Sequence, residues 1–138
     1  MFFKHVVNPT LPVEVRRRRL ERMTRFNWLP SGTRVEPVVA GGVPAEWVVP
    51  RTVNSESVLL YLHGGGYAIG SPASHRTLVA HLAQAAGMRA LVPHYRLGPE
   101  HHFPCALNDS VAAYRWLRNH GRVDPSRVVV AATRQAAV

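Results

Sequence analysis

The sequence has 138 residues, of which 46% are hydrophobic, and a formal net charge of +9. This composition excludes a disordered or collagen-like chain, and no uncharged apolar run approaches the roughly 20 residues that a membrane-spanning helix needs. Cys105 is the only cysteine and cannot form an internal disulfide, so we expect a globular, cytoplasmic protein of single-domain length without a transmembrane segment.

The first predicted element is a moderately amphipathic helix from Pro12 to Trp28, which Pro30 to Gly32 bring to an end. Its apolar side recurs at helical spacing and comprises Val13, Leu20, Met23 and Asn27 or Trp28. Eight of the seventeen basic residues, but only two of the eight acidic residues, lie within residues 1–34. We therefore treat residues 1–34 as a basic N-terminal helical segment.

The arginines of this segment permit a second interpretation. Arg16 to Arg19, Arg22 and Arg25 could form a basic module that binds nucleic acid or an anionic membrane surface. Aromatic residues are sparse among them, and the sequence has no nucleic-acid-binding motif. These features favour a solvated helix face, so we expect no nucleic-acid partner.

The next elements are strands. Two β-branched runs, residues 35–39 and 45–49, flank a Gly-Gly-Val-Pro turn and predict an antiparallel pair. Residues 58–62, Val-Leu-Leu-Tyr-Leu, have no polar alternation, which is typical of a strand buried on both faces of a sheet. This strand leads directly into His63-Gly64-Gly65-Gly66.

Helices and strands then alternate. A helix is expected over residues 75–86, with caps at Ser71 to Ser74 and Gly87, and a second helix over residues 104–120. Their expected core faces are Leu78, Val79, Leu82 and Ala86 in the first, and Leu107, Val111, Tyr114 and Leu117 in the second. Buried strands are expected at residues 89–95 and from residue 128 to 131. This order predicts an α/β fold with a mostly parallel sheet and flanking helices.

The three glycines after the strand at residues 58–62 are the most informative feature for function. Glycines at this place allow backbone N–H groups to point into a cavity without interference from a Cβ, and such donors can bind the developing oxyanion of an acyl-transfer reaction. A plain structural loop and a phosphate cradle are the alternatives. Neither spacing of the common phosphate-binding motifs is present.

Several blocks of sequence together carry a family resemblance. They are LLYLHGGGY at residues 59–67 with Ser71 and Ser74-His75, YRLGPE at 95–100, FPCAL at 103–107 with Asp109, GVPAEW at 42–47 and DPSR at 124–127. In this order the blocks resemble the hormone-sensitive-lipase-like (GDXG) esterases, a branch of the α/β-hydrolases. The sequence departs from the family pattern at His94, Gly98 and Cys105.

The resemblance implies a carboxylic-ester hydrolase, acting on small esters through a Ser-Asp/Glu-His triad without metal or cofactor. Residues 1–34 would correspond to a cap over the acyl pocket, and residues 35–138 to an incomplete α/β-hydrolase domain. Gly64, Gly65 and Gly66 would form the oxyanion hole. His63 occupies a signature position, and we assign it to holding the glycine loop, because the triad histidine follows later in chains of this type.

The family nucleophile is expected after the strand at residue 128, within Gly-Asp-Ser-Ala-Gly-Gly. The sequence instead reads Ala-Ala-Thr-Arg-Gln-Ala-Ala from residue 131 to 137. One G inserted into one choice of codons for these residues restores Ala-Gly-Asp-Ser-Ala-Gly-Gly. We therefore interpret the chain as a truncated fragment, frameshifted after about Ala131, that ends at the nucleophile-elbow strand and lacks nucleophile, acid and base.

Two consequences follow from this interpretation. The strand at residue 128 would lie at an unprotected sheet edge, through which the chain could self-associate. An oxyanion hole without a nucleophile has nothing to stabilise, so we expect no ester hydrolysis by this chain alone.

The remaining candidate residues are weighed against structural roles. His94, His101 and His102 with Glu100 could ligate a metal, but their spacing fits no common site, and we expect loop histidines and no metal. Cys105 could act as a thiol nucleophile beside these histidines, but a small packed residue is the simpler interpretation. Glu100 and Asp109 are assigned structural roles in the loop and at the helix start.

Overall fold

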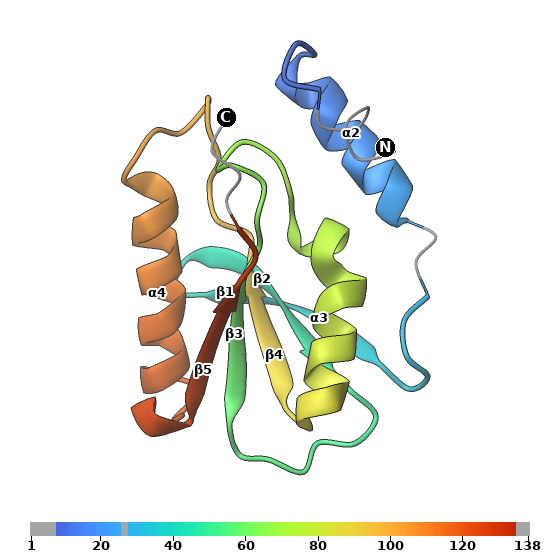
Figure 1. Ribbon diagram of the computed structural model, residues 1–138. Coiled ribbons are helices and arrows are strands. Elements are labelled where there is room, and N and C mark those ends of the chain that lie inside the picture. Colours follow the sequence, from blue (N-terminus) through green and yellow to red (C-terminus); the bar gives the residue numbers. More distant parts are fainter. Residues whose placement is uncertain (1–7, 26–27, 135–138) are drawn as a thin grey trace.

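A computed structural model describes residues 8–25 and 28–134 (Figure 1). In chain order the elements are α2 (Val13–Thr24), β1 (Arg34–Ala40), β2 (Val43–Val49), β3 (Val58–Leu62), α3 (Pro72–Ala86), β4 (Arg89–Pro93), α4 (Cys105–Asn119), the 3₁₀ helix η1 (Pro125–Arg127) and β5 (Val128–Ala132). One sheet with the strand order β1-β2-β4-β3-β5 lies between α3 on one face and α4 on the other. The α/β layering predicted from the sequence is confirmed.

β1 and β2 form the predicted antiparallel pair. Their two-residue turn, Gly41-Gly42, has φ values of 62° and 83°, which glycine adopts without a steric penalty. β2 also pairs antiparallel with β4, whereas β3 pairs in parallel with both β4 and β5. Strands β4, β3 and β5 are therefore parallel, as expected, whereas the β1–β2 hairpin adds antiparallel pairings and makes the sheet mixed.

β3 is buried on both faces, as its apolar sequence predicted. Leu60 belongs to the core between the sheet and α4, together with Leu91 and Leu117. Leu59 and Tyr61 belong to the opposite core, which α3 covers. Each residue of β3 therefore has apolar neighbours, because the two helices cover opposite faces of the sheet.

α3 starts and ends where its sequence signals predicted. The Ser71 and Ser74 side chains form a reciprocal capping box, and Gly87 ends the helix in the left-handed region with φ 65°. The predicted core face is partly wrong, because Leu78, Leu82 and Ala86 are exposed. The helix packs on the sheet through Val79, Ala80 and Ala83, about one residue further round its axis, which leaves Leu78 and Leu82 outside the contact.

The predicted core face of α4 also needs correction. Ala113 and Leu117 are fully buried, but Leu107 and Val111 are exposed. The covered and the exposed stripes have the same helical period, and only packing against the sheet distinguishes them. The preceding strand β4 is shorter than predicted and ends at Pro93.

β5 has the predicted position, but the prediction that it is buried is wrong. It pairs only with β3, and Val129 and Val130 are exposed, Val130 to 57%. β5 is an edge strand, so one of its sides has no neighbour among the described strands. An apolar strand sequence therefore lies on the surface.

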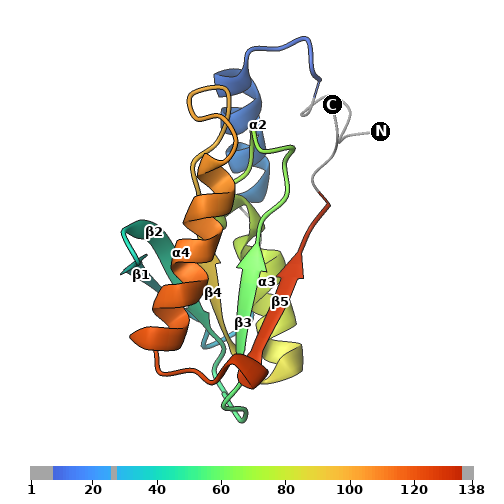
Figure 2. The ribbon, with the colours of Figure 1, turned by 90° about the vertical axis from the view of Figure 1, so that its left-hand side faces the viewer.

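α2 lies over the end of the sheet at which β3, β4 and β5 finish (Figures 1 and 2). Leu20 packs against Ile69, with Val13 and Met23 beside them, as the helical pattern predicted. Trp28 lies beyond the helix and is 89% exposed, so its predicted place on the apolar face is wrong; Asn27 lies outside the described residues. No helix in the described parts of the chain is long and apolar enough to cross a membrane.

Candidate active site

The glycine loop begins where β3 ends, at the sheet end below α2. Gly65 and Gly66 have φ values of 130° and 62°, and a Cβ on Gly65 would collide with the carbonyl oxygen of Ile69. Within residues 8–25 and 28–134, no backbone carbonyl accepts a hydrogen bond from the amide of Gly65 or Gly66. The amides of Gly65 and Gly66 therefore have no backbone acceptor in the described part of the chain.

His63 lies beneath this loop and is completely buried. Its ring stacks on Tyr95, with centroids 4.3 Å apart and planes 7° apart. His63 Nδ1 lies 3.0 Å from the Gly64 carbonyl oxygen, and since that oxygen only accepts, Nδ1 is the donor. The Tyr95 hydroxyl donates to the carbonyl oxygen of His63. Burial lowers the pKa of His63 to about 4, so the imidazole is neutral at pH 7.

The chain after β5 passes directly against the glycine loop. A Cβ built on Gly64 would lie 2.6 Å from Thr133 Oγ1 and 2.8 Å from the carbonyl oxygen of Arg134. Only glycine fits there while Thr133 and Arg134 keep these positions. The structure thus brings together the oxyanion-loop candidate and the segment in which the resemblance to the esterases places the nucleophile.

Two cavities open beside this meeting point. One, of about 530 Å³, lies between the ends of β3 and β5 and the start of α4, and Leu62, Tyr67, Leu107 and Ala132 help to line it. The other, of about 540 Å³, extends from Gly66 and Tyr67 to Val13 and Arg16 near the start of α2. Both volumes are in the range of small-molecule sites.

Arg17 joins α2 to both loops around these cavities. Its Nε donates to the carbonyl oxygen of Ala68 at 2.8 Å, two residues beyond Gly66. Its Nη2 donates to the carbonyl oxygen of Gly98 at 2.8 Å, and both terminal nitrogens contact the Glu100 carboxylate at 2.8 and 2.9 Å. The hydrogen bond from Arg17 is the main reason that the pKa of Glu100 falls to about 2.

Arg17→Gln is expected to lower the free energy of unfolding by about 1–2 kcal/mol, because it removes four hydrogen bonds while part of the ion pair is screened by solvent. The rate of amide hydrogen exchange should rise more in α2 than in β3. Arg34→Gln is the matched control, because the Arg34–Glu36 pair is exposed and 3.6 Å long. Equal losses of stability in the two variants would contradict this role of Arg17.

Asp109 accepts hydrogen bonds from Arg96, at 2.9 Å from the backbone amide and 2.8 Å from the guanidinium. Burial would raise the pKa of Asp109, but the bonds with Arg96 outweigh burial and lower it. This contact ties the loop after β4 to α4.

The candidate histidines His94, His101 and His102 lie in loops. The backbone amide of His94 donates to Pro44, that of His101 to Leu97, and Cys105 begins α4 as a half-buried thiol. In the described ranges, no group of three His, Cys, Asp or Glu side chains is arranged to hold a metal ion.

The glycine loop therefore lies at the end of the parallel strands β3 and β5, beside two cavities. Residues 59–132 match the family of the alpha/beta hydrolase fold, which covers more than half of the chain. The chain therefore belongs to the α/β-hydrolase family. Within that family it is a hormone-sensitive-lipase-like member, as the following similarities show.

An acetyl-hydrolase of Streptomyces hygroscopicus is 51% identical over 94 residues, covering 68% of this chain and 31% of the relative. The carboxylesterase NlhH of Mycobacterium tuberculosis is 35% identical over 130 residues, covering 86% and 40% respectively. A solved esterase of the bacterial hormone-sensitive lipase family superposes with a TM-score of 0.82 at 41% identity, covering 94% of this chain and 46% of that one. The chain thus spans less than half the length of these relatives.

Three contacts at the site have no signal in the local sequence. Tyr95 is recognisable only as part of a motif, and its stacking on His63 follows from two strands that end side by side. Arg17 and Glu100 are separated by 83 positions, and no local pattern pairs them. Gly70 has φ 93°, and a Cβ there would lie 2.7 Å from His63 Nδ1, which a lone glycine in a loop sequence does not reveal.

Proposed function

We propose that this chain forms the oxyanion-loop half of a carboxylic-ester hydrolase. The observation that carries the proposal is the pair of backbone amides at Gly65 and Gly66, which have no backbone acceptor in the described residues. They belong to a loop whose first glycine, Gly64, lies against the segment after β5. Donors fixed in this way stabilise the negative charge of a tetrahedral intermediate. His63, buried and stacked on Tyr95, serves to hold the loop.

The proposed substrate class is small esters. The cavity between β3, β5 and α4 is lined mainly by apolar and aromatic side chains, among them Leu62, Phe103 and Leu107, which suit a short acyl chain. The names of two relatives, an acetyl-hydrolase and a carboxylesterase, agree with this class. α2, with Val13 and Arg16 at the second cavity, acts as the cap.

We further propose that this chain cannot complete the reaction by itself. Arg134 stands in the register of the family serine, and a guanidinium is not a nucleophile. A single-base deletion after about Ala131 accounts for the altered residues 132–137. Sequencing the gene tests this: one restored base must recover the Gly-Asp-Ser-Ala-Gly-Gly motif, and failure of every single-base change to do so refutes the deletion.

A chimera tests the proposed function itself. It joins residues 1–131 of this chain to the part of the carboxylesterase NlhH that follows the matched position, so that the altered residues 132–137 are replaced. We expect the chimera to hydrolyse p-nitrophenyl acetate and the 138-residue chain to show no PMSF-sensitive hydrolysis. A folded chimera without turnover, or turnover by the chain alone, would overturn the corresponding proposal.

The 138-residue polypeptide is also proposed to self-associate through β5. The unpaired edge of β5 and the exposed Val129 and Val130, together with Leu107 and Val111 on α4, form uncovered apolar surface. Val130→Lys is expected to weaken self-association about tenfold in sedimentation velocity, because it buries a charge at the contact. Val39→Lys on the opposite edge strand is the matched control, and an equal effect of both would rule out β5 as the contact.

A further inference from the structure

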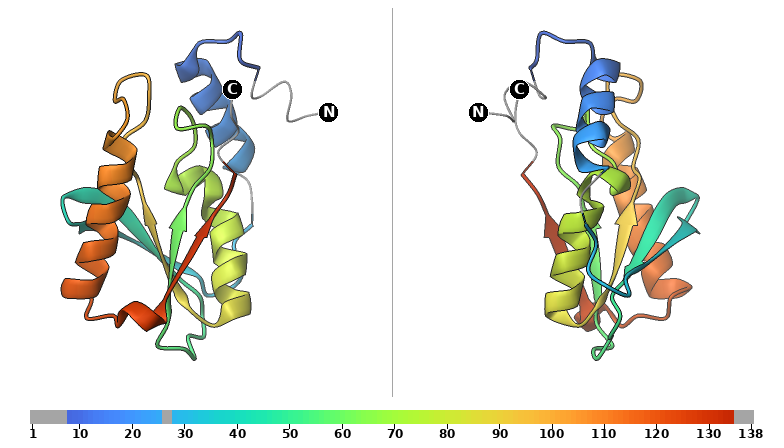
Figure 3. Two further views of the ribbon diagram at one scale, coloured as in Figure 1. Left: turned by 60° about the vertical axis from the view of Figure 1, so that its left-hand side comes forward. Right: turned by 90° about the vertical axis from the view of Figure 1, so that its right-hand side faces the viewer.

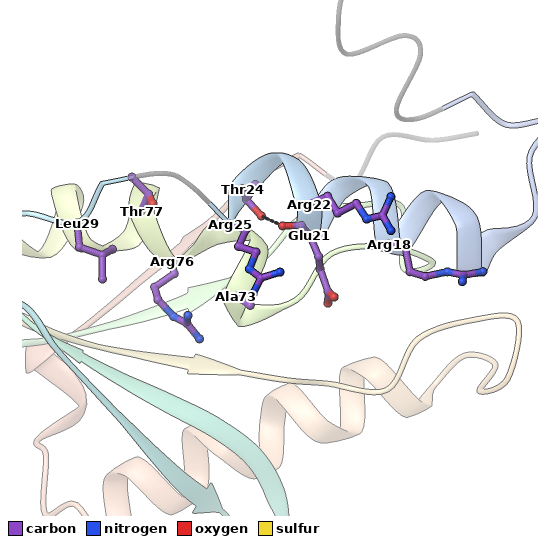
Figure 4. Close-up of a pocket in the computed structure, with 9 residues that line it drawn as sticks. All are labelled: Arg18, Glu21, Arg22, Thr24, Arg25, Leu29, Ala73, Arg76 and Thr77. Carbon is purple, nitrogen blue, oxygen red and sulfur yellow. Dashed lines mark hydrogen bonds between the residues drawn. The ribbon is translucent and has the colours of Figure 1, made fainter.

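A further cleft lies between α2 and α3. It shares no lining residue with the two cavities beside the glycine loop. Its volume is about 530 Å³. Four of its nine lining residues are arginines, namely Arg18, Arg22, Arg25 and Arg76, and a single carboxylate, Glu21, lines it with them (Figure 4). The site is therefore strongly positive.

The arginines reach the cleft from two helices. Arg18, Arg22 and Arg25 follow one another at spacings of four and three, so they share one face along α2 and its end. Arg76 lines the cleft from α3, and in Figure 4 the side chains of Arg18 and Arg22 extend along α2 away from Arg76. Arginines from both helices therefore line the same cleft.

The positive charge of the cleft is only partly neutralised. Arg76 is paired with the Glu46 carboxylate at 2.6 Å, whereas the contact of Arg18 Nε at 3.4 Å is with the uncharged carbonyl oxygen of Glu14. In the described part of the chain, no carboxylate lies within ion-pair distance of Arg22 or Arg25. Like charges held in one cleft repel each other, and an anion between them relieves that repulsion.

Guanidinium groups bind tetrahedral oxyanions through pairs of parallel N–H donors. The excess of arginines over Glu21 fits a group with more than one negative charge. We propose that this cleft binds a phosphate group, held by Arg22 and Arg25 with Arg18 beside them. The phosphate can belong to a free phosphate compound or to a lipid headgroup.

Titration calorimetry with inorganic phosphate at constant ionic strength tests the site on the 138-residue chain. We expect saturable binding that the double variant Arg22→Gln/Arg25→Gln weakens at least about tenfold, since two charged donors are lost. Glu21→Gln should tighten binding by roughly threefold, because it removes the only carboxylate of the cleft. Arg115→Gln, on the exposed face of α4, removes the same charge elsewhere and should leave binding unchanged.

Vesicles identify the source of the phosphate. We assign the cleft to a lipid headgroup if the chain co-sediments with phosphatidylglycerol vesicles and not with phosphatidylcholine vesicles. Inorganic phosphate must also compete with this binding, and the double variant must lose it. Phosphate binding without vesicle binding assigns it to a free phosphate compound. No phosphate binding, equal binding by the double variant, or binding of duplex DNA that phosphate does not compete for would overturn the proposal.

Discussion

Gly65→Ala is expected to lower kcat of the NlhH chimera for p-nitrophenyl acetate by about 100- to 1000-fold. The added methyl group would collide with the Ile69 carbonyl oxygen, and Gly65 has φ 130°, a conformation that alanine does not readily adopt. The loop must therefore move, and the amides of Gly65 and Gly66 lose their alignment with the developing oxyanion. KM should change much less, because the substrate cavities keep their lining residues.

Gly42→Ala is the matched control for this substitution. Gly42 also has positive φ, 83°, but a Cβ there meets nothing within 4 Å, and the residue lies in the β1–β2 turn. This variant should lose about 1 kcal/mol of stability and keep its kcat. Equal losses of kcat in the two variants would show that the glycine loop is not an oxyanion hole.

Acid should unfold the chain through His63. The pKa of His63 is about 4 in the folded protein because the ring is buried, whereas an unfolded histidine titrates near 6.5. A lowered folded pKa means that the unfolded state binds the proton more tightly. Stability from this group is therefore complete above pH 6.5 and declines as the pH falls toward 4, by about 3 kcal/mol in total.

Urea unfolding at pH 7 and pH 4 measures this loss. His63→Gln removes the titrating ring, so its free energy of unfolding should fall by about 3 kcal/mol less between the two pH values than that of the unchanged chain. His81→Gln replaces an exposed imidazole of α3 and should keep the full pH dependence. An unchanged dependence in His63→Gln would exclude His63 as the source of acid sensitivity.

Local signals predicted much of the fold. The apolar run at residues 58–62 marks the bounds of β3, and Ser71 and Gly87 mark the ends of α3, because caps and left-handed glycines act within one turn. The glycine loop is also evident from local sequence, because three consecutive glycines follow the residue directly after the buried strand. Its contact with Thr133 and Arg134 agrees with the chain order expected for the family.

Features that depend on long-range packing could not be predicted. In α3 and α4 two adjacent stripes are apolar, and only the position of the sheet decides that Val79 and Leu117 are buried while Leu82 and Leu107 are exposed. The exposure of Val130 depends on β5 being an edge strand, which strand order alone determines. The contact between Arg17 and Glu100 requires α2 to lie over the loop after β4.

The structure of the chimera inactivated with a p-nitrophenyl phosphonate tests the central claim most directly. The phosphonyl oxygen mimics the oxyanion of the tetrahedral intermediate. We predict that this oxygen lies about 3 Å from the backbone nitrogens of Gly65 and Gly66, the distance of a charge-assisted hydrogen bond. A phosphonyl oxygen that is directed away from both amides would contradict the assignment of this loop as an oxyanion hole.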